Sequence, residues 1–254
     1  MGTFEKFVRK NWFIYYMVRM IYEFFLSNFF FESDCKVFSS LKNKKNLKIV
    51  DIGSSNGVFS RYISKYLYGS KFYCFEPLFF LHKQLKITKN KNNSILIKKG
   101  CGEKSKKVII FTPYIEIFKI KLYFKFFSSI DKSFIIQNLF FYFKKKNFKF
   151  KKTEIKIKKL DSFKLNPDII KIDTENYELN IIIGALKTIK KYKPIIMIEN
   201  PSKKINVILD KLNYQKYQYL KETHKLKKVQ NNNNKTYNYF YICKKKGVER
   251  LFKF

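Results

Sequence analysis

The stretch "KIVDIGSSNGVFSRY" at residues 48–62 contains an apolar run, an aspartate, two glycines and then the start of an expected helix. A strand that ends in a glycine turn and leads into a helix is typical of nucleotide sites in α/β proteins. A dinucleotide turn follows the pattern G-x-G-x-x-G, but here only Gly53 and Gly57 are present. A phosphate loop needs a lysine after its second glycine, where this chain has Val58. The turn therefore fits neither phosphate-binding pattern.

What remains is the pattern D-x-G-x-x-x-G at the end of one strand, with Glu76 at the end of the next expected strand. A carboxylate in that place can accept hydrogen bonds from both hydroxyls of a ribose. Asp51 adds negative charge near a turn whose glycines let a ligand approach the backbone. These features favour a nucleoside with a cationic sulfonium and an amino acid end. By itself, the motif is also compatible with a structural turn or another nucleotide site.

Apolar runs alternate with helix-length segments along most of the chain. The expected order is strand 47–52, helix 57–67, strand 71–77, helix 78–90, strand 94–99, then strand 167–173, helix 178–192, strand 193–200, helix 202–212 and two last strands around a polar loop. This alternation predicts an α/β fold with a mostly parallel, helix-covered sheet and an antiparallel last strand. Two further strands are expected at 107–112 and 154–163.

Residues 112–152 form an insertion that is rich in aromatic residues and lysines and has no clean period. Two interpretations stay open. The insertion is either an excursion with packed aromatics and solvated lysines, or a cap over the acceptor site, because long insertions in compact domains tend to be functional.

Six motifs occur in the order that is typical of one enzyme family. They are "VDIGSSNG" (50–57), "FEP" (75–77), "KKGCGEKS" (98–105), "KKLDSF" (158–163), "IKIDTENYEL" (170–179) and "GALKTIKKYKPIIMIE" (184–199). Through these motifs, residues 47–200 resemble the FkbM-type methyltransferases, which use S-adenosylmethionine. The resemblance implies a Rossmann-like class I methyltransferase fold with a seven-stranded sheet. It also implies methyl transfer to a hydroxyl, often of a glycan or small-metabolite acceptor.

The resemblance also implies the cofactor-binding residues. Asp51, Gly53 and Gly57 would shape the methionine end of the site, with Ser54 and Ser55 in the same turn, Glu76 on the ribose, and Gly100 and Cys101 against the adenine. The family usually has Asn where Ser55 stands, so the contact there is expected to be weaker or different. Asn176 replaces the usual glycine after the "IDTE" segment, and asparagine tolerates left-handed backbone well enough for the turn to survive.

Charged residues gather around the strand at 167–173. Lys171 lies inside it, while Asp173 and Glu175 crowd its end. Buried charges are costly unless paired, so the cluster is predicted to be either an ion-pair network between strands or a reactive site. In a reactive site, Asp173, with Glu175 or Glu199, would orient or deprotonate an acceptor hydroxyl. Carboxylates also suit Mg²⁺ or Ca²⁺, but no metal site is expected.

The formal net charge is +35, and all but four of the basic residues are lysines. Asn, Ile, Phe and Tyr are abundant as well, so A- and T-rich codons explain the lysine excess, and a nucleic-acid partner is not expected. Two alternatives to glycan methylation stay open. The charge favours an RNA ribose methyltransferase, whereas the changes at Ser55 and Asn176 favour a non-catalytic, membrane-associated scaffold with the same fold.

Residues 1–44 are predicted to form an N-terminal helical segment, 45–245 the methyltransferase domain and 246–254 a basic tail. The aromatic stretch at 11–31 is interrupted by Arg19 and Glu23, which share one face of a helix. This pattern favours a helix that packs on protein or contacts a membrane surface over one that spans a membrane. We expect a cytoplasmic protein, with peripheral membrane contact as an option, and expect His82 and His224 at its surface.

Overall fold

The computed structural model describes residues 13–14, 17–18, 32–83, 85, 93–143, 147–229 and 236–244. The chain forms two compact units. The larger contains Phe31–Lys106, Lys156–Thr174 and Glu178–Phe254, and the smaller contains Met1–Phe30, Lys107–Ile155 and Glu175–Tyr177. The domain boundaries placed after residues 44 and 245 stay predictions.

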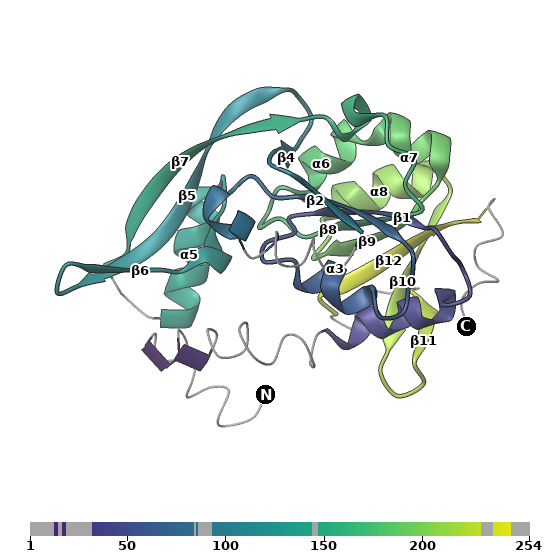
Figure 1. Cartoon of the computed structure of the whole chain (residues 1–254), viewed down its shortest axis with the longest axis horizontal. Coiled ribbons are helices and arrows are strands. Elements are labelled where there is room, and N and C mark those ends of the chain that lie inside the picture. Colours follow the sequence, from purple (N-terminus) through teal and green to yellow (C-terminus); the bar gives the residue numbers. More distant parts are fainter. Residues whose placement is uncertain are drawn as a thin grey trace. The chain divides into compact units, whose positions relative to one another are not determined.

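A sheet with the strand order β11-β10-β12-β9-β8-β1-β2-β3 forms the centre of the larger unit (Figure 1). The bounds are Lys48–Ile52 (β1), Lys71–Phe75 (β2), Ser94–Ile97 (β3), Ile169–Ile172 (β8), Ile195–Glu199 (β9), Tyr214–Leu220 (β10), Lys225–Lys228 (β11) and Asn238–Cys243 (β12). The strands from β3 to β9 pair in parallel, and β12 runs antiparallel to both of its neighbours. This arrangement confirms the Rossmann-like class I methyltransferase fold and its antiparallel last strand.

The sheet has eight strands where seven were predicted. The additional strand, β11, pairs antiparallel with β10, and Leu226 is its one buried residue. Its sequence, KLKK, has too few apolar positions to predict a strand. The free edge of β10 supplies the hydrogen-bonding partner that makes these residues extended.

Helices cover both faces of this sheet (Figure 1). On one side lie α3 (Val58–Ile63) and the 3-10 helix η2 (Ser33–Leu41), and on the other lie α6 (Glu178–Gly184), α7 (Leu186–Tyr192) and α8 (Lys203–Lys211). The short 3-10 helices η3 (Phe79–Leu81) and η5 (Leu160–Phe163) join other elements. The helix predicted at 178–192 is two helices, because Ala185 leaves the helical conformation, with φ −114° and ψ 3°.

The smaller unit contains most of a second sheet with the order β4-β7-β5-β6. The strands of this sheet are β4 (Gly100–Cys101, which belongs to the larger unit), β5 (Lys106–Ile117), β6 (Ile120–Tyr123) and β7 (Lys149–Lys158). Between β6 and β7 the chain forms the 3-10 helix η4 (Lys125–Phe127) and the helix α5 (Lys132–Phe143). One face of α5 packs in a hydrophobic cluster with Phe124 and Phe127, through its buried residues Ile135, Leu139 and Phe143. The insertion is therefore a folded hairpin, helix and strand with its own core. Its aromatics occupy both buried and exposed positions, which hides the period.

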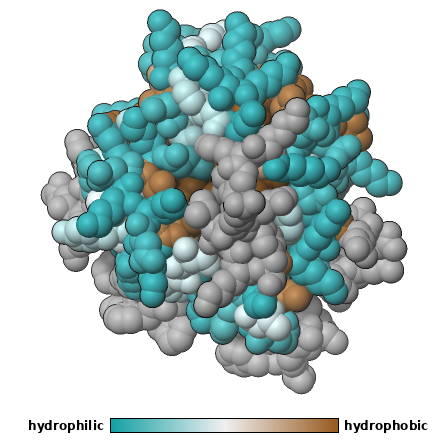
Figure 2. Space-filling model, turned by 90° about the vertical axis from the view of Figure 1, so that its right-hand side faces the viewer, coloured by the Kyte–Doolittle hydropathy of each residue, from teal (hydrophilic) through white to brown (hydrophobic). Residues whose placement is uncertain are grey.

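Of the helix predicted at 11–31, residues 13–14 and 17–18 are described and are helical. The other residues of that segment and the basic tail lie outside the described residues. Within the described part of the chain, no helix combines the length and apolar character that a bilayer crossing needs. Figure 2 shows one face of the molecule, where hydrophilic side chains cover most of the described surface.

Candidate active site

The turn after β1 is held by hydrogen bonds to the end of β2. The backbone N–H groups of Gly53 and Ser54 both donate to the Phe75 carbonyl, at 3.1 Å each. Within the turn, the Ser54 hydroxyl donates to the Asp51 carbonyl at 2.7 Å. Gly53, Ser55 and Gly57 have positive φ angles of 80°, 48° and 78°. Glycine adopts this conformation at little cost, whereas Ser55 carries strain that persists only where its surroundings enforce it.

Glu76 is brought to this turn by β2. One of its carboxylate oxygens accepts from the Ser55 N–H at 2.9 Å and the other from the Leu78 N–H at 2.8 Å. Burial raises the pKa of Glu76 to about 7, although these two N–H groups act in the opposite direction. The predicted ribose-binding carboxylate therefore lies directly beside the predicted cofactor turn.

His82 is buried, which corrects the expectation that it lies at the surface. Its Nε2 donates to the backbone carbonyl of Glu76 at 2.8 Å, because η3 folds the chain back after β2. The ring thus supports the backbone of Glu76. His224 is exposed, as predicted.

Gly53 also lies against the end of β8. A Cβ atom at this position would stand 1.9 Å from the Asp173 carbonyl oxygen and 2.9 Å from the Thr174 Cγ2 atom. The chain therefore needs glycine here for the contact of two neighbouring strand ends, and not only for access by a ligand. This contact joins the cofactor turn to the predicted acceptor residues.

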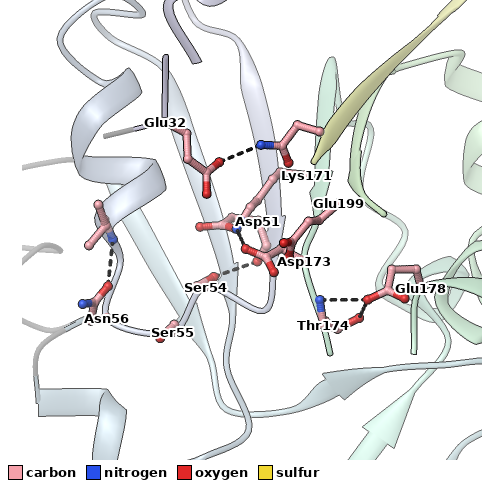
Figure 3. A network of polar contacts seen from close by, with 12 residues as sticks. Glu32, Asp51, Ser54, Ser55, Asn56, Lys171, Asp173, Thr174, Glu178 and Glu199 are labelled. Atoms are coloured by element: carbon pink, nitrogen blue, oxygen red, sulfur yellow. Dashed lines mark hydrogen bonds and ion pairs between the residues drawn. The ribbon is translucent and has the colours of Figure 1, made fainter. Parts of the chain in front are cut away.

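Lys171 is buried and lies at the centre of a charge cluster (Figure 3). Its Nζ is 2.8 Å from Asp173 Oδ2 and 3.8 Å from Asp51 Oδ1, and it lies over the Phe59 ring at 5.3 Å. Asp51 and Lys171 are register partners on β1 and β8, so their backbones run side by side. The predicted ion-pair network is present, and it joins a predicted cofactor-binding residue to a predicted acceptor-site residue.

The cluster shifts the pKa of its members. Burial raises the pKa of Asp51 to about 6, and Lys171 acts against this rise. Burial acts to lower the pKa of Lys171, but the carboxylates of Asp173, Asp51 and Glu32 outweigh burial and raise it. Neither Asp51 carboxylate oxygen has a hydrogen-bond partner within the described part of the chain. Buried polar atoms without a hydrogen bond are uncommon because each costs free energy, so these oxygens are suited to accept hydrogen bonds from a ligand.

Glu32 belongs to the same cluster, although its sequence context gave no sign of this. Its carboxylate accepts from the Asn238 amide at 2.8 Å, across 206 positions of sequence. Glu32 itself is exposed. Figure 3 shows its side chain directed toward the group around Lys171. Three carboxylates, those of Glu32, Asp51 and Asp173, thus surround one lysine, which suits a cationic ligand.

The other two predicted acids differ in position. Glu199 ends β9 one residue beyond the Ile172–Ile198 pair, at the same sheet edge as Asp173, and accepts a weak hydrogen bond of 3.5 Å from the Asn200 side chain. Glu175 belongs to the smaller unit, where its carbonyl accepts from the Ser129 hydroxyl at 2.6 Å. Asn176 has a φ of 71°, the left-handed conformation that was predicted from its replacement of glycine.

Gly100 and Cys101 form β4 and pair with Ile157 and Lys158 of β7. They follow β3, whose last residue, Ile97, accepts a backbone hydrogen bond from Glu76 at 3.1 Å. Burial raises the pKa of Cys101, so its thiol is protonated at neutral pH and acts as an apolar surface. The segment is thus located near Glu76, while its contact with an adenine stays a prediction.

S-adenosylmethionine fits the residues of this site. The Asp51 carboxylate makes no hydrogen bond within the described residues and shares one lysine with two other carboxylates, so the net negative charge suits the ammonium and sulfonium of the cofactor. Glu76, at the end of the neighbouring strand, suits a ribose diol. Across the described residues, no group of three or more His, Cys, Asp or Glu side chains is arranged to hold a metal ion.

In a comparison with protein families, the sequence model of the methyltransferase FkbM domain matches residues 51–219 of this chain. Among solved structures, methyltransferase FkbM from Methylobacillus flagellatus KT is 16% identical over 86% of this chain and 46% of its own, with a TM-score of 0.48. This chain therefore spans about half the length of that protein. No curated protein sequence matches the chain.

Two further solved structures are similar. A TehB-like SAM-dependent methyltransferase from Corynebacterium glutamicum is 9% identical over 90% of this chain and 96% of its own, with a TM-score of 0.45. A SAM-dependent O-methyltransferase from Thermotoga maritima is 12% identical over 85% of this chain and 68% of its own, with a TM-score of 0.41.

Proposed function

Because the chain belongs to the FkbM methyltransferase family, we propose that it is an S-adenosylmethionine-dependent O-methyltransferase. We propose a hydroxyl of a sugar or glycan-type molecule as its acceptor. When bound, S-adenosylmethionine supplies an electrophilic methyl group. The observation that carries the proposal is the Asp51–Lys171–Asp173 network, which couples the cofactor turn to an accessible carboxylate at the next strand end.

Asp173 is the group proposed to act on the acceptor. Its side chain is 33% exposed, and its ion pair with Lys171 favours the ionised carboxylate. An ionised carboxylate at this edge can accept a hydrogen bond from a hydroxyl and take its proton as the methyl group is transferred. Glu199 and Glu175 are further candidates for orienting the acceptor. Alignment of the hydroxyl supplies much of the rate, and a base contributes about 10² to 10⁴ in addition.

Cofactor binding is tested first, by calorimetric titration with S-adenosylmethionine. We expect the native chain to bind and Glu76→Ala to lose most of its affinity. Asp210→Asn, an exposed change on α8, serves as the matched control and should bind like the native chain. Native protein that is folded but does not bind would contradict the proposal and favour the scaffold alternative. In that case, restored binding in Ser55→Asn would identify the cause.

The acceptor is tested by mass spectrometry of surface glycans from a strain that lacks the gene. We expect these glycans to lose the mass of one methyl substituent, and expect the native gene, but not Asp173→Asn, to restore it. Unchanged glycans would refute this acceptor class even if the cofactor binds.

RNA ribose methylation is the second candidate, because the net charge of +35 favours a polyanion. Binding to RNA that falls steeply with salt and yields methylated ribose would support it. The same binding without a methylated product would mean that the charge is incidental to the reaction.

A further inference from the structure

The β5–β6 hairpin of the smaller unit ends in a two-residue turn (Figure 1), and the apolar residues at this turn are exposed. We propose that this hairpin tip, residues 117–121, docks the protein on an anionic lipid membrane by inserting Phe118 and Ile120 among the lipids. This interaction surface is independent of the proposed methyl transfer, since none of its residues belongs to the candidate active site.

Folding alone gives no reason for the residues at the tip. Phe118 is 95% exposed and Ile120 is 64% exposed. Phe118 and Lys119 form a two-residue turn with φ angles of 47° and 66°. Such turns strongly prefer Asn and Gly, because a residue with a bulky side chain is strained at positive φ. The chain therefore carries both strain and exposed apolar surface here, a combination that often marks a functional contact.

The strands behind the tip carry tyrosines and lysines. Tyr114 and Tyr123 face each other across β5 and β6, with ring centroids 5.3 Å apart. Lys121 Nζ lies 5.6 Å from the Tyr114 ring, and Lys151 Nζ lies 5.5 Å from the Tyr123 ring. Tyrosines with apolar bodies and polar ends, next to lysines that extend along them, are typical of side chains at the level of lipid headgroups. From tip to base, the apolar residues on either side of Lys119 are thus followed by aromatic and basic residues.

The charge of this region complements an anionic surface. Residues 107–155 contain eleven lysines and three acidic residues. Two of these acids, Glu116 and Glu154, are already paired with Lys149 and Lys107. Lysines near an anionic leaflet each contribute to attraction, and inserted apolar side chains add binding that salt does not screen.

A membrane explains the tip better than a nucleic acid does. Residues 107–155 contain no arginine, the residue that binds phosphates in a planar, bidentate manner. Ile120 has no ring that could stack on a base, yet it is exposed beside Phe118. An exposed aliphatic side chain can insert among lipid chains but cannot stack on a base, so a membrane is the favoured partner.

The test is co-sedimentation of the purified full chain with phosphatidylcholine vesicles, with and without phosphatidylserine. We expect the native chain to bind the vesicles that contain phosphatidylserine, and Phe118→Ser/Ile120→Ser to reduce its partition about tenfold or more. Tyr68→Ser is the matched control, because Tyr68 is an exposed aromatic of the larger unit, and it should bind like the native chain. Unchanged binding of the double variant, or no binding of the native chain, would overturn the proposal.

A fluorescence measurement covers the case in which the double variant does not fold. The chain has a single tryptophan, Trp12, so Trp12→Phe/Phe118→Trp reports from the hairpin tip alone. We expect its emission to shift to shorter wavelength when vesicles with phosphatidylserine are added. An unshifted spectrum, or a shift produced by single-stranded RNA but not by vesicles, would overturn the proposal.

Discussion

At the scale of single residues, the site is defined by charges that the fold places where water is scarce. Glu76 and Asp51 end adjacent strands, and burial raises the pKa of both. Burial therefore disfavours the ionised form of each carboxylate. A cofactor that donates hydrogen bonds or carries positive charge favours the ionised forms, so binding removes part of this cost.

The pH dependence of stability tests the burial of Glu76. The folded chain holds the proton of Glu76 up to a pH of about 7, above the ordinary value of 4.5, so this group destabilises the fold progressively as the pH rises between those values. We would measure the free energy of unfolding in urea at pH 4.5 and at pH 7. Between these two pH values, Glu76→Gln should lose about 3 kcal/mol less stability than the native chain. Equal losses in the two proteins would mean that Glu76 is not buried as described.

Removing the charge of Lys171 should be costly. Lys171→Met leaves Asp51 and Asp173 without their cation, and breaking a buried pair costs about 3–5 kcal/mol. Urea unfolding measures the loss, with Lys187→Met on the exposed face of α7 as the control. The double variant Lys171→Met/Asp51→Asn should recover part of the stability. A double variant as unstable as the sum of the single variants would argue against their coupling.

At the scale of secondary structure elements, the site depends on how closely two strand ends approach. Gly53 and Gly69 have similar positive φ angles, 80° and 74°, but only Gly53 would direct a Cβ atom into a carbonyl, that of Asp173. They therefore form a matched pair that separates backbone strain from crowding.

Replacing each of these glycines by alanine should separate the two effects. Both variants carry the strain of left-handed backbone, about 1–2 kcal/mol, and Gly53→Ala adds about 1–3 kcal/mol from the clash with Asp173. We expect Gly53→Ala to be the less stable variant in urea and to bind S-adenosylmethionine more weakly. Equal stabilities would mean that the strand ends separate easily.

Most elements of the sheet could be predicted because their apolar patterns are local. Strands such as β1 and β8 are short apolar runs between turn signals, and the structure confirms them. The exceptions depend on distant partners. The edge strand β11 exists because β10 lies beside it, and the helix predicted at 178–192 breaks at Ala185, which is fully buried. A periodic pattern contains no information about such neighbours.

For the whole molecule, the dominant feature is its net charge of +35, which comes from 54 basic and 19 acidic residues. With 19 acidic residues for 54 basic ones, most of the basic side chains cannot each have an acidic partner, although the buried lysine of the site is paired. Such an imbalance keeps a protein soluble but destabilises its compact state through repulsion between like charges.

Salt should therefore stabilise this protein. Raising the sodium chloride concentration from about 0.01 M to about 0.1 M shortens the Debye length from about 30 Å to about 10 Å and screens the repulsion. We expect the thermal midpoint to rise, by about 2–4 °C for each kcal/mol of repulsion relieved. Sodium sulfate at equal ionic strength distinguishes screening from specific anion binding. A midpoint that falls with salt would mean that ion pairs outweigh the repulsion.

Local periodicity and spacing were enough to predict the strand–turn–helix unit, the parallel α/β order, and the positions of Asp51 near the end of β1 and Glu76 just after β2. The sequence also placed Lys171 and Asp173 at one strand end. Three contacts could not be predicted in this way: the hydrogen bond from Asn238 to Glu32, the approach of Lys171 to Asp51, and the room that Gly53 leaves for Asp173. These contacts join residues that are far apart in sequence, and packing of the whole chain brings them together.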